Sequence, residues 1–316
     1  MIRFILFIFS ILLASDQIPG AKQSKPILLK GGTLHPISSN SIVSDIILKD
    51  GKIAKIGKDL LLNKAEVIDI TGLHVYPGFI ASATTLGLVE INAVRASEDH
   101  SEVGRYNPNV RVERAYNPDS ELVPITRSNG ILNIHLIPKS GRVSGTSAVM
   151  QLDGWTWEDC IVKSPSGIHI NWPWMAIAKH RWEKRSEEKQ REDIQNQIKD
   201  LKDFFNDSRY YLEAKKNDME IDVKFESMIP LLERQIPAYI HANRIEQIES
   251  AIYFAKEQEI DMVLIGGADS WMVSSLLKEN NISVIYEHPL STPMRRGEAY
   301  DIKYVVPKLL YESGVK

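Results

Sequence analysis

A strand and helix pattern that repeats in the last third of the chain constrains the fold most. Strand-like apolar runs at 238–242, 262–267 and 282–286 recur at intervals of roughly 20 to 25 residues. Between them, apolar residues recur at helical spacing over 245–255 and 272–277. Strands that alternate with single helices form parallel sheets, and eight such units close a barrel of about 250 residues. The pattern therefore predicts an α/β fold, a (β/α)8 TIM-type barrel.

The segment before the repeats has a different pattern. Short strands are expected at 26–34, 45–57 and 67–76, the second of them folded around an Asp50-Gly51 turn. Turn residues separate these runs at regular intervals, and no helix is needed. We therefore expect residues 22–76 to form part of a small N-terminal β-sandwich, and residues 77–316 to form the barrel.

A highly charged stretch interrupts the second part of the chain. Ile194, Ile198 and Leu201 follow helical spacing among charged residues of both signs. The mixture favours a solvated helix face over a surface for a nucleic acid or another partner. We interpret residues 176–230 as a charged helical insertion in the barrel.

The first residues resemble a secretory signal peptide. Arg3 precedes an apolar run at 4–14 that is short for a membrane span, and small residues follow it. We assign residues 1–21 to this peptide and expect a periplasmic or secreted protein with no stable membrane insertion after cleavage. An uncleaved anchor or a buried strand remains the alternative.

Composition excludes several classes of protein. The 316 residues carry 38 basic and 41 acidic side chains, a net charge of −3, and 43% are hydrophobic. These values argue against a disordered chain, a multi-span membrane protein and a basic nucleic-acid binder. Cys160 is the only cysteine, so a disulfide framework and a thiolate zinc site are both excluded. Any metal would need histidine and carboxylate ligands.

The junction at 72–80, Gly-Leu-His-Val-Tyr-Pro-Gly-Phe-Ile, carries a family resemblance. Together with the Gly-Gly-Thr-Leu run at 31–34 and the hairpin at 50–53, it resembles the metal-dependent amidohydrolase superfamily, in particular its imidazolonepropionase-like secreted group. Further similar motifs lie at 86–91, 107–111, 116–120 and 152–159. The resemblance implies a (β/α)8 barrel beside a β-sandwich built from both chain ends. It also implies hydrolysis of a carbon–nitrogen bond by a metal-activated water.

The chain departs from the family at the first metal half-site. After the Pro-Gly, the family carries Asp-x-His-x-His, whose two imidazoles bind one divalent metal. The matching positions here are Ala81, Ala83 and Thr85. Alanine has no ligand atom, and a neutral hydroxyl is a poor substitute for imidazole. Ala83 and Thr85 therefore mark a degenerate metal site.

Other family positions retain polar side chains. His241 matches the strand-5 histidine and is the candidate metal ligand, although a hydrogen-bonded structural histidine is the alternative. Asp269, Glu287 and His288 follow the next two strands and are candidates for the pocket rim. Asp269 also suits a helix N-cap, and His288 precedes a proline, so a turn explains it equally well. The family's strand-8 aspartate would lie beyond Lys316, which predicts a C-terminally incomplete barrel.

Further clusters have both functional and structural explanations. Residues 98–102, Glu-Asp-His-Ser-Glu, suit a cation or a solvated loop, and we favour the loop. Residues 141–148 suit an anion-binding loop, but we interpret them as a structural βα turn. Tryptophans at 155, 157, 172 and 174 suit a ligand wall or the edge of a core. We expect His74, His135 and His169 to be structural.

These observations support one principal hypothesis and two alternatives. The principal hypothesis is a metal-dependent amidohydrolase that uses zinc or a similar divalent ion on the carbon–nitrogen bond of a non-peptide or cyclic amide. Its partner would be a small-molecule substrate and not a nucleic acid; the oligomeric state stays open. The alternatives are a catalytically inactive secreted binding protein, or an inactive fragment of an amidohydrolase.

Overall fold

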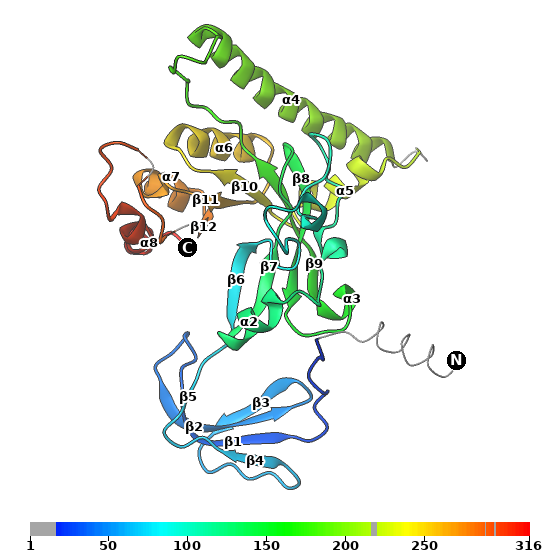
Figure 1. Ribbon diagram of the computed structural model, residues 1–316, viewed down its shortest axis with the longest axis vertical. Coiled ribbons are helices and arrows are strands. Elements are labelled where there is room, and N and C mark those ends of the chain that lie inside the picture. The colour runs from blue at the N-terminus through cyan, green and yellow to red at the C-terminus, as the bar shows by residue number, and fades with distance from the viewer. Residues whose placement is uncertain (1–16, 216–219, 288, 294) are drawn as a thin grey trace.

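The computed structural model describes residues 17–215, 220–287, 289–293 and 295–316. Figure 1 shows a small N-terminal sheet at one end of the molecule, a larger sheet in the middle and a long helix at the other end. Most of the segment assigned to a signal peptide, and His288, lie outside the described residues. No helix within the described ranges is long and apolar enough to cross a membrane.

The N-terminal part forms one five-stranded sheet. Its strands are β1 (Ile27–Leu34), β2 (Ile42–Lys49), β3 (Lys52–Gly57), β4 (Glu66–Asp69) and β5 (His74–Val75). The sheet order is β3-β2-β1-β4, with β5 also paired to β1. β2 and β3 form an antiparallel hairpin around the turn at Asp50 and Gly51, where both residues have positive φ. The strands expected between 26 and 76 are therefore confirmed.

A buried carboxylate anchors this sheet. Asp45 on β2 accepts hydrogen bonds from the backbone N–H groups of Gly31 (2.8 Å) and Leu60 (2.9 Å). These two bonds favour the ionised form and lower the pKa of Asp45. Leu60 in turn packs with Leu28 and Ile47 in a small core.

The larger sheet has seven strands in the order β12-β11-β10-β9-β8-β7-β6 and forms a nearly closed, barrel-like sheet. The strands are β6 (Phe79–Thr84), β7 (Ile131–Leu136), β8 (Val143–Gln151), β9 (Ile161–Asn171), β10 (Ala238–Ala242), β11 (Met262–Gly266) and β12 (Ser283–Tyr286). The mixed α/β, barrel-like fold expected from the repeats is confirmed.

One strand breaks the expected parallel pattern. β8 runs antiparallel to both β7 and β9, whereas the pairs from β9 to β12 are all parallel. The connection between β7 and β8 is residues 137–142, and a parallel crossover needs a dozen residues or more. Residues 143–148 therefore belong to a strand, and the interpretation of 141–148 as a βα turn is wrong.

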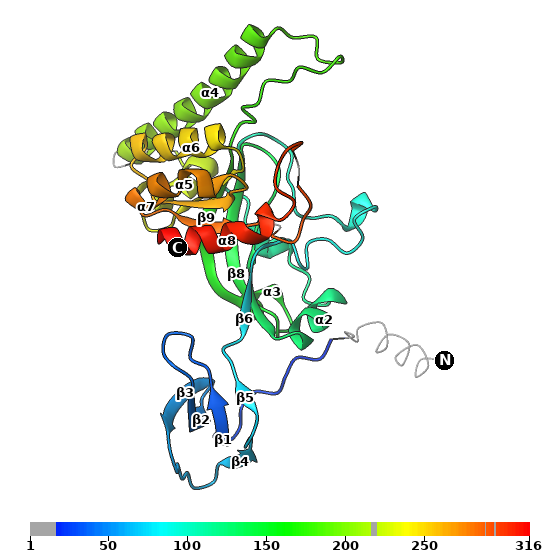
Figure 2. The same ribbon diagram turned by 90° about the vertical axis from the view of Figure 1, so that its left-hand side faces the viewer.

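Helices and short turns connect the strands and cover the sheet. The α-helices are α2 (Leu122–Ser128), α3 (Trp157–Cys160), α4 (Glu187–Ala214), α5 (Val223–Leu232), α6 (Ile245–Glu257), α7 (Ser274–Glu279) and α8 (Ile302–Ser313). The 3-10 helices are η1 (Arg95–Ser97), η2 (Val112–Ala115) and η4 (Ser270–Val273). Figure 2 shows α8 crossing in front of the strands, with α7 beside it.

The charged stretch forms the long helix α4. Ser186 caps its first turn by accepting a hydrogen bond from the Lys189 N–H at 3.1 Å, and Glu187 and Glu188 follow at the positive end of the helix dipole. The apolar stripe expected from the spacing is buried, at Ile194, Ile198, Leu201 and Phe205. The opposite face carries solvated ion pairs, which contribute little stability individually.

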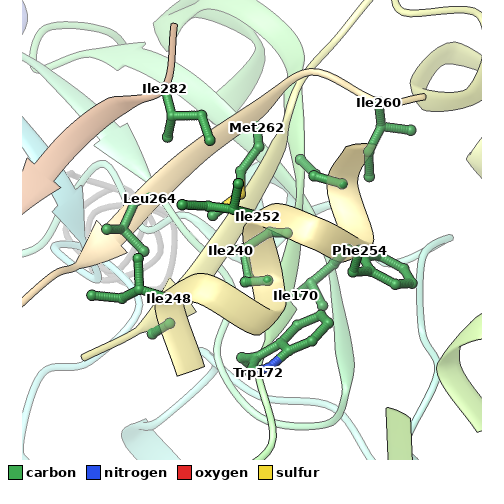
Figure 3. Close-up of a cluster of buried hydrophobic side chains, with 14 of the residues drawn as sticks. Ile170, Trp172, Ile240, Ile248, Ile252, Phe254, Ile260, Met262, Leu264 and Ile282 are labelled. Carbon is green, nitrogen blue, oxygen red and sulfur yellow. The ribbon is translucent and has the colours of Figure 1, made fainter. Parts of the chain in front are cut away.

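The main hydrophobic core lies between α4, α6 and the parallel strands. Ile240 on β10 and Leu264 on β11 are fully buried beneath Ile248 and Ile252 of α6 (Figure 3). Phe254 also points into this core, with its ring centroid 5.2 Å from that of Trp172 and 5.1 Å from that of Phe205. This packing holds the helices against the sheet and sets the positions of the strand ends.

The paired residues Tyr253 and Phe254 test this account of the core. Phe254 is 2% exposed and Tyr253 is 60% exposed on the same helix. Truncating the buried ring leaves a cavity, so we expect Phe254→Ala to lower the free energy of unfolding by about 3–5 kcal/mol. The matched control Tyr253→Ala should change it by about 0.5 kcal/mol or less. Urea denaturation measures both, and equal losses would contradict the assigned packing.

Candidate functional site

An irregular strand end forms one wall of the candidate site. In the pairing of β6 with β7, Ala81 lies opposite Ile134 and Thr84 opposite Leu136, so β6 has one residue more than its partner. This is a β-bulge, and Ala83 within it has a φ of 53°. A left-handed alanine costs roughly 1–2 kcal/mol, and such strain persists only where the surrounding structure holds it.

A cavity of about 810 Å³ opens beside this bulge. It is lined by residues 81–85 of β6 and its following turn, by 139–141 after β7, and by Asn171, His241 and Glu287 at the ends of β9, β10 and β12. The ends of β6, β7, β9, β10 and β12 therefore meet at one pocket. Its volume lies within the range of small-molecule sites, and strand ends in barrels are the usual position of such sites.

Three imidazoles form a cluster at the pocket: His241 is half-buried in its lining, and His135 and His169 are buried. The Nδ1 atom of His169 and the Nε2 atom of His241 are 2.9 Å apart and share a hydrogen bond. His135 lies beside them, its ring centroid 5.7 Å from that of His169 and 4.6 Å from that of Tyr239. The parallel register of β9 and β10 places Tyr239 opposite His169, and their rings stack at 4.9 Å.

Burial keeps these imidazoles neutral. Desolvation lowers the pKa of His135 to about 4 and that of His241 to about 4, with the positive charge of Lys139 adding to the effect at His241. The pKa of His169 is lowered for the same reason and by its histidine neighbours. At neutral pH the cluster therefore supplies uncharged hydrogen-bonding groups and carries no positive charge.

The donor set at the pocket does not fit a divalent metal. The alanines at 81 and 83 offer no ligand atoms, and the Thr84 hydroxyl already accepts a hydrogen bond from the Leu86 N–H. His241 Nε2 is engaged with His169, which leaves Glu287 as the one carboxylate in the lining. No three His, Cys, Asp or Glu side chains in the described ranges are grouped to hold a metal ion.

Asp269 has a structural position away from the pocket lining. It is 2% exposed and forms an ion pair with Arg295, whose Nη1 lies 3.0 Å from Oδ2. The Ile245 N–H also donates to Oδ2 at 3.3 Å, so the carboxylate caps α6 and makes no capping bond to η4. Asp269 therefore stands at the N-cap position of η4 without a side-chain capping bond, and its carboxylate bonds to the first turn of α6 instead. Of the expected rim residues, Glu287 lines the pocket.

Two other sequence clusters have structural roles. In residues 98–102, the His100 carbonyl accepts the Lys139 N–H at 2.7 Å, which ties this loop to the pocket wall. The four tryptophans form no common wall, because Trp172 is buried in the core while Trp155 and Trp174 are exposed. Trp174 instead stacks against the Arg244 guanidinium at 5.7 Å.

His135 and His169, which the sequence leads us to expect as structural, are buried and form a cluster with His241 that no local pattern predicts. Each lies within an apolar strand-like run, which is also where a structural histidine is expected. The one available signal was that both stand near the ends of their strands, as His241 does. Their proximity depends on the antiparallel strand β8 that separates β7 from β9.

The comparisons with known proteins agree with this architecture. An amidohydrolase of solved structure from Thermotoga maritima MSB8 is 26% identical, aligns with 92% of this chain and 76% of its own, and has a TM-score of 0.79. A dihydroorotase from Solibacter usitatus is 43% identical over 56 residues, and a D-hydantoinase from Geobacillus stearothermophilus is 44% identical over 62 residues. This chain is thus similar in fold, and over short stretches in sequence, to proteins of the amidohydrolase superfamily.

The sequence matches to this superfamily are local. The dihydroorotase and D-hydantoinase alignments cover 17% and 19% of this chain, and each covers 13% of the relative's own length. No family model matches the chain. The similarity to this superfamily therefore rests mainly on the fold.

The neutral imidazoles predict a pH-dependent stability. Unfolded histidines titrate near 6.5, so between pH 6.5 and about 4 the unfolded state binds protons that the folded state rejects. The free energy of unfolding should therefore fall as the pH falls through this window. For His135 alone the loss at the acidic end is on the order of 3 kcal/mol, since a pKa difference of one corresponds to about 1.4 kcal/mol.

Urea denaturation between pH 7 and 5 measures this slope, and histidine substitutions assign it. His135→Leu removes one buried imidazole and should make the slope shallower, whereas the exposed control His180→Gln should leave it unchanged. The window stays above the range in which carboxylates such as Asp45 titrate. Identical slopes for the three proteins would show that His135 is not held neutral by burial.

Proposed function

We propose that this chain binds a small amide-bearing molecule at the mouth of its barrel and does not hydrolyse it with a metal. The observation that carries the proposal is that an open pocket is lined by Ala81, Ala83 and Thr85, the positions that match the Asp-x-His-x-His motif of the family. Hydroxyl and amide groups at this wall suit the carbonyl and N–H groups of an amide. The alternative of a binding protein that has lost metal chemistry is thus favoured.

Hydrolysis of a carbon–nitrogen bond is the second candidate. It is supported by the similarity to the Thermotoga maritima amidohydrolase and by His241 and Glu287, which share the pocket. A divalent ion such as zinc would have to be held by a ligand set unlike that expected from the imidazolonepropionase-like group. The 2.9 Å contact of His241 with His169 opposes this, because it occupies the Nε2 atom.

The cellular location of the protein and its binding partners are proposed from the sequence alone. A protein of this superfamily with a signal peptide at 1–21 would act in the periplasm or outside the cell on a small molecule. The net charge of −3 disfavours a nucleic-acid partner.

Hydantoin tests the proposed pocket, because a D-hydantoinase is among the relatives and the ring carries two amide groups. Calorimetry should show binding of hydantoin to the wild-type protein, with no ring opening detected by chromatography. Ser82→Leu places a bulky side chain in the lining and should weaken binding about tenfold or more. The control Ser39→Leu adds the same bulk to an exposed turn of the N-terminal part and should leave binding unchanged.

Two results would contradict this proposal. Equal hydantoin affinity in the Ser82→Leu and Ser39→Leu proteins would place the binding site elsewhere. Ring opening by the wild-type protein that is lost in His241→Ala would favour the hydrolase instead.

A further inference from the structure

The pocket contains one cation and one anion that the protein does not pair. Among its lining residues, Lys139 is the one lysine or arginine and Glu287 the one acidic side chain. Neither Lys139 nor Glu287 forms an ion pair with another residue in the described part of the chain. Two opposite charges thus face one cavity without neutralising each other.

The loop that carries Lys139 is firmly held. Its backbone N–H donates to the His100 carbonyl at 2.7 Å. The Asn171 side-chain amide donates to the carbonyls of Ser140 (3.2 Å) and Gly141 (3.0 Å), and the Ser144 hydroxyl donates to Ser140 as well. These bonds fix the base of the flexible lysine side chain at the pocket wall, so less ordering entropy is lost when its ammonium group meets a ligand.

Glu287 enters the same cavity from a different strand. It directly follows β12, and its backbone N–H donates to the Gly266 carbonyl of β11 at 3.2 Å. Lys139 follows β7, which lies at the other side of the sheet order. The cation and the anion are therefore presented by separate structural elements, which suits a ligand with two separated charges.

We propose that the pocket selects a zwitterion of the amino-acid or dipeptide class, with the ligand carboxylate at Lys139 and the ligand ammonium at Glu287. This inference rests on the proposed function and names the ligand class of the same site. A ligand with only a negative charge would be repelled by Glu287, and one with only a positive charge by Lys139. A cavity of about 810 Å³ has room for a dipeptide.

Four small probes separate the two charges. Calorimetry at pH 7 compares alanyl-alanine, its N-acetyl form without the ammonium, its C-terminal amide without the carboxylate, and hydantoin. We expect the wild-type protein to bind alanyl-alanine about tenfold more tightly than either blocked form.

Variants then assign each charge of the ligand to one side chain. Lys139→Met should weaken the binding of alanyl-alanine about tenfold but strengthen that of the C-terminal amide, because it removes the repulsion of the ligand ammonium. Glu287→Gln should weaken the binding of alanyl-alanine similarly but strengthen that of the N-acetyl form, because it removes the repulsion of the ligand carboxylate. Lys163→Met and Glu121→Gln remove exposed charges that do not line the pocket and should behave as wild type.

The outcomes distinguish a failure of the zwitterion inference from a failure of the proposed function on which it rests. Equal affinities for the charged and blocked dipeptides, or binding of hydantoin with no binding of alanyl-alanine, would overturn the zwitterion inference and leave the pocket standing. Failure of folded wild-type protein to bind either alanyl-alanine or hydantoin would overturn both.

Discussion

Parallel pairing from β9 to β12 is the constraint on which the pocket depends. Because the four strands run in one direction, their carboxyl ends meet at one edge, and Asn171, His241 and Glu287 all lie at or just beyond such an end. The apolar face of α6 holds these strands from one side through Ile248, Ile252 and Phe254. The packing of α6 against the strands therefore fixes the strand ends and, with them, the side chains that line the pocket.

Below the pocket, the balance between desolvation and hydrogen bonding decides the chemistry. Imidazoles that lose their hydration on burial need another polar partner, and coordination to a metal would supply one. His241 instead shares a hydrogen bond with His169. Desolvation then lowers the pKa of each ring, and the cluster stays neutral. The charges available to a ligand are left at the rim, on Lys139 and Glu287. This separation of a neutral floor from a charged rim favours recognition over metal catalysis.

Sequence reasoning succeeded where a local pattern determines the structure. The strands near 238–286 and the helix α4 follow from apolar periodicity, and the β2–β3 hairpin follows from its Asp-Gly turn. That Ala83 and Thr85 stand where the resemblance implies imidazoles is also read directly from the sequence. β8 was missed because its small residues, with Gly145 among them, resemble a turn until β7 and β9 flank them. The cluster of His135, His169 and His241 depends on contacts between three strands, which no local pattern contains.

The central claim is that this amidohydrolase-like pocket works without a bound metal. Elemental analysis of the purified protein for zinc, iron, manganese and nickel, after equilibration with each ion and gel filtration, tests it most directly. The account predicts well below one metal per chain, with no difference between wild type and His241→Ala. A content of about one metal ion per chain that is lost in His241→Ala would contradict the account. It would favour the hypothesis of a metal-dependent hydrolase instead.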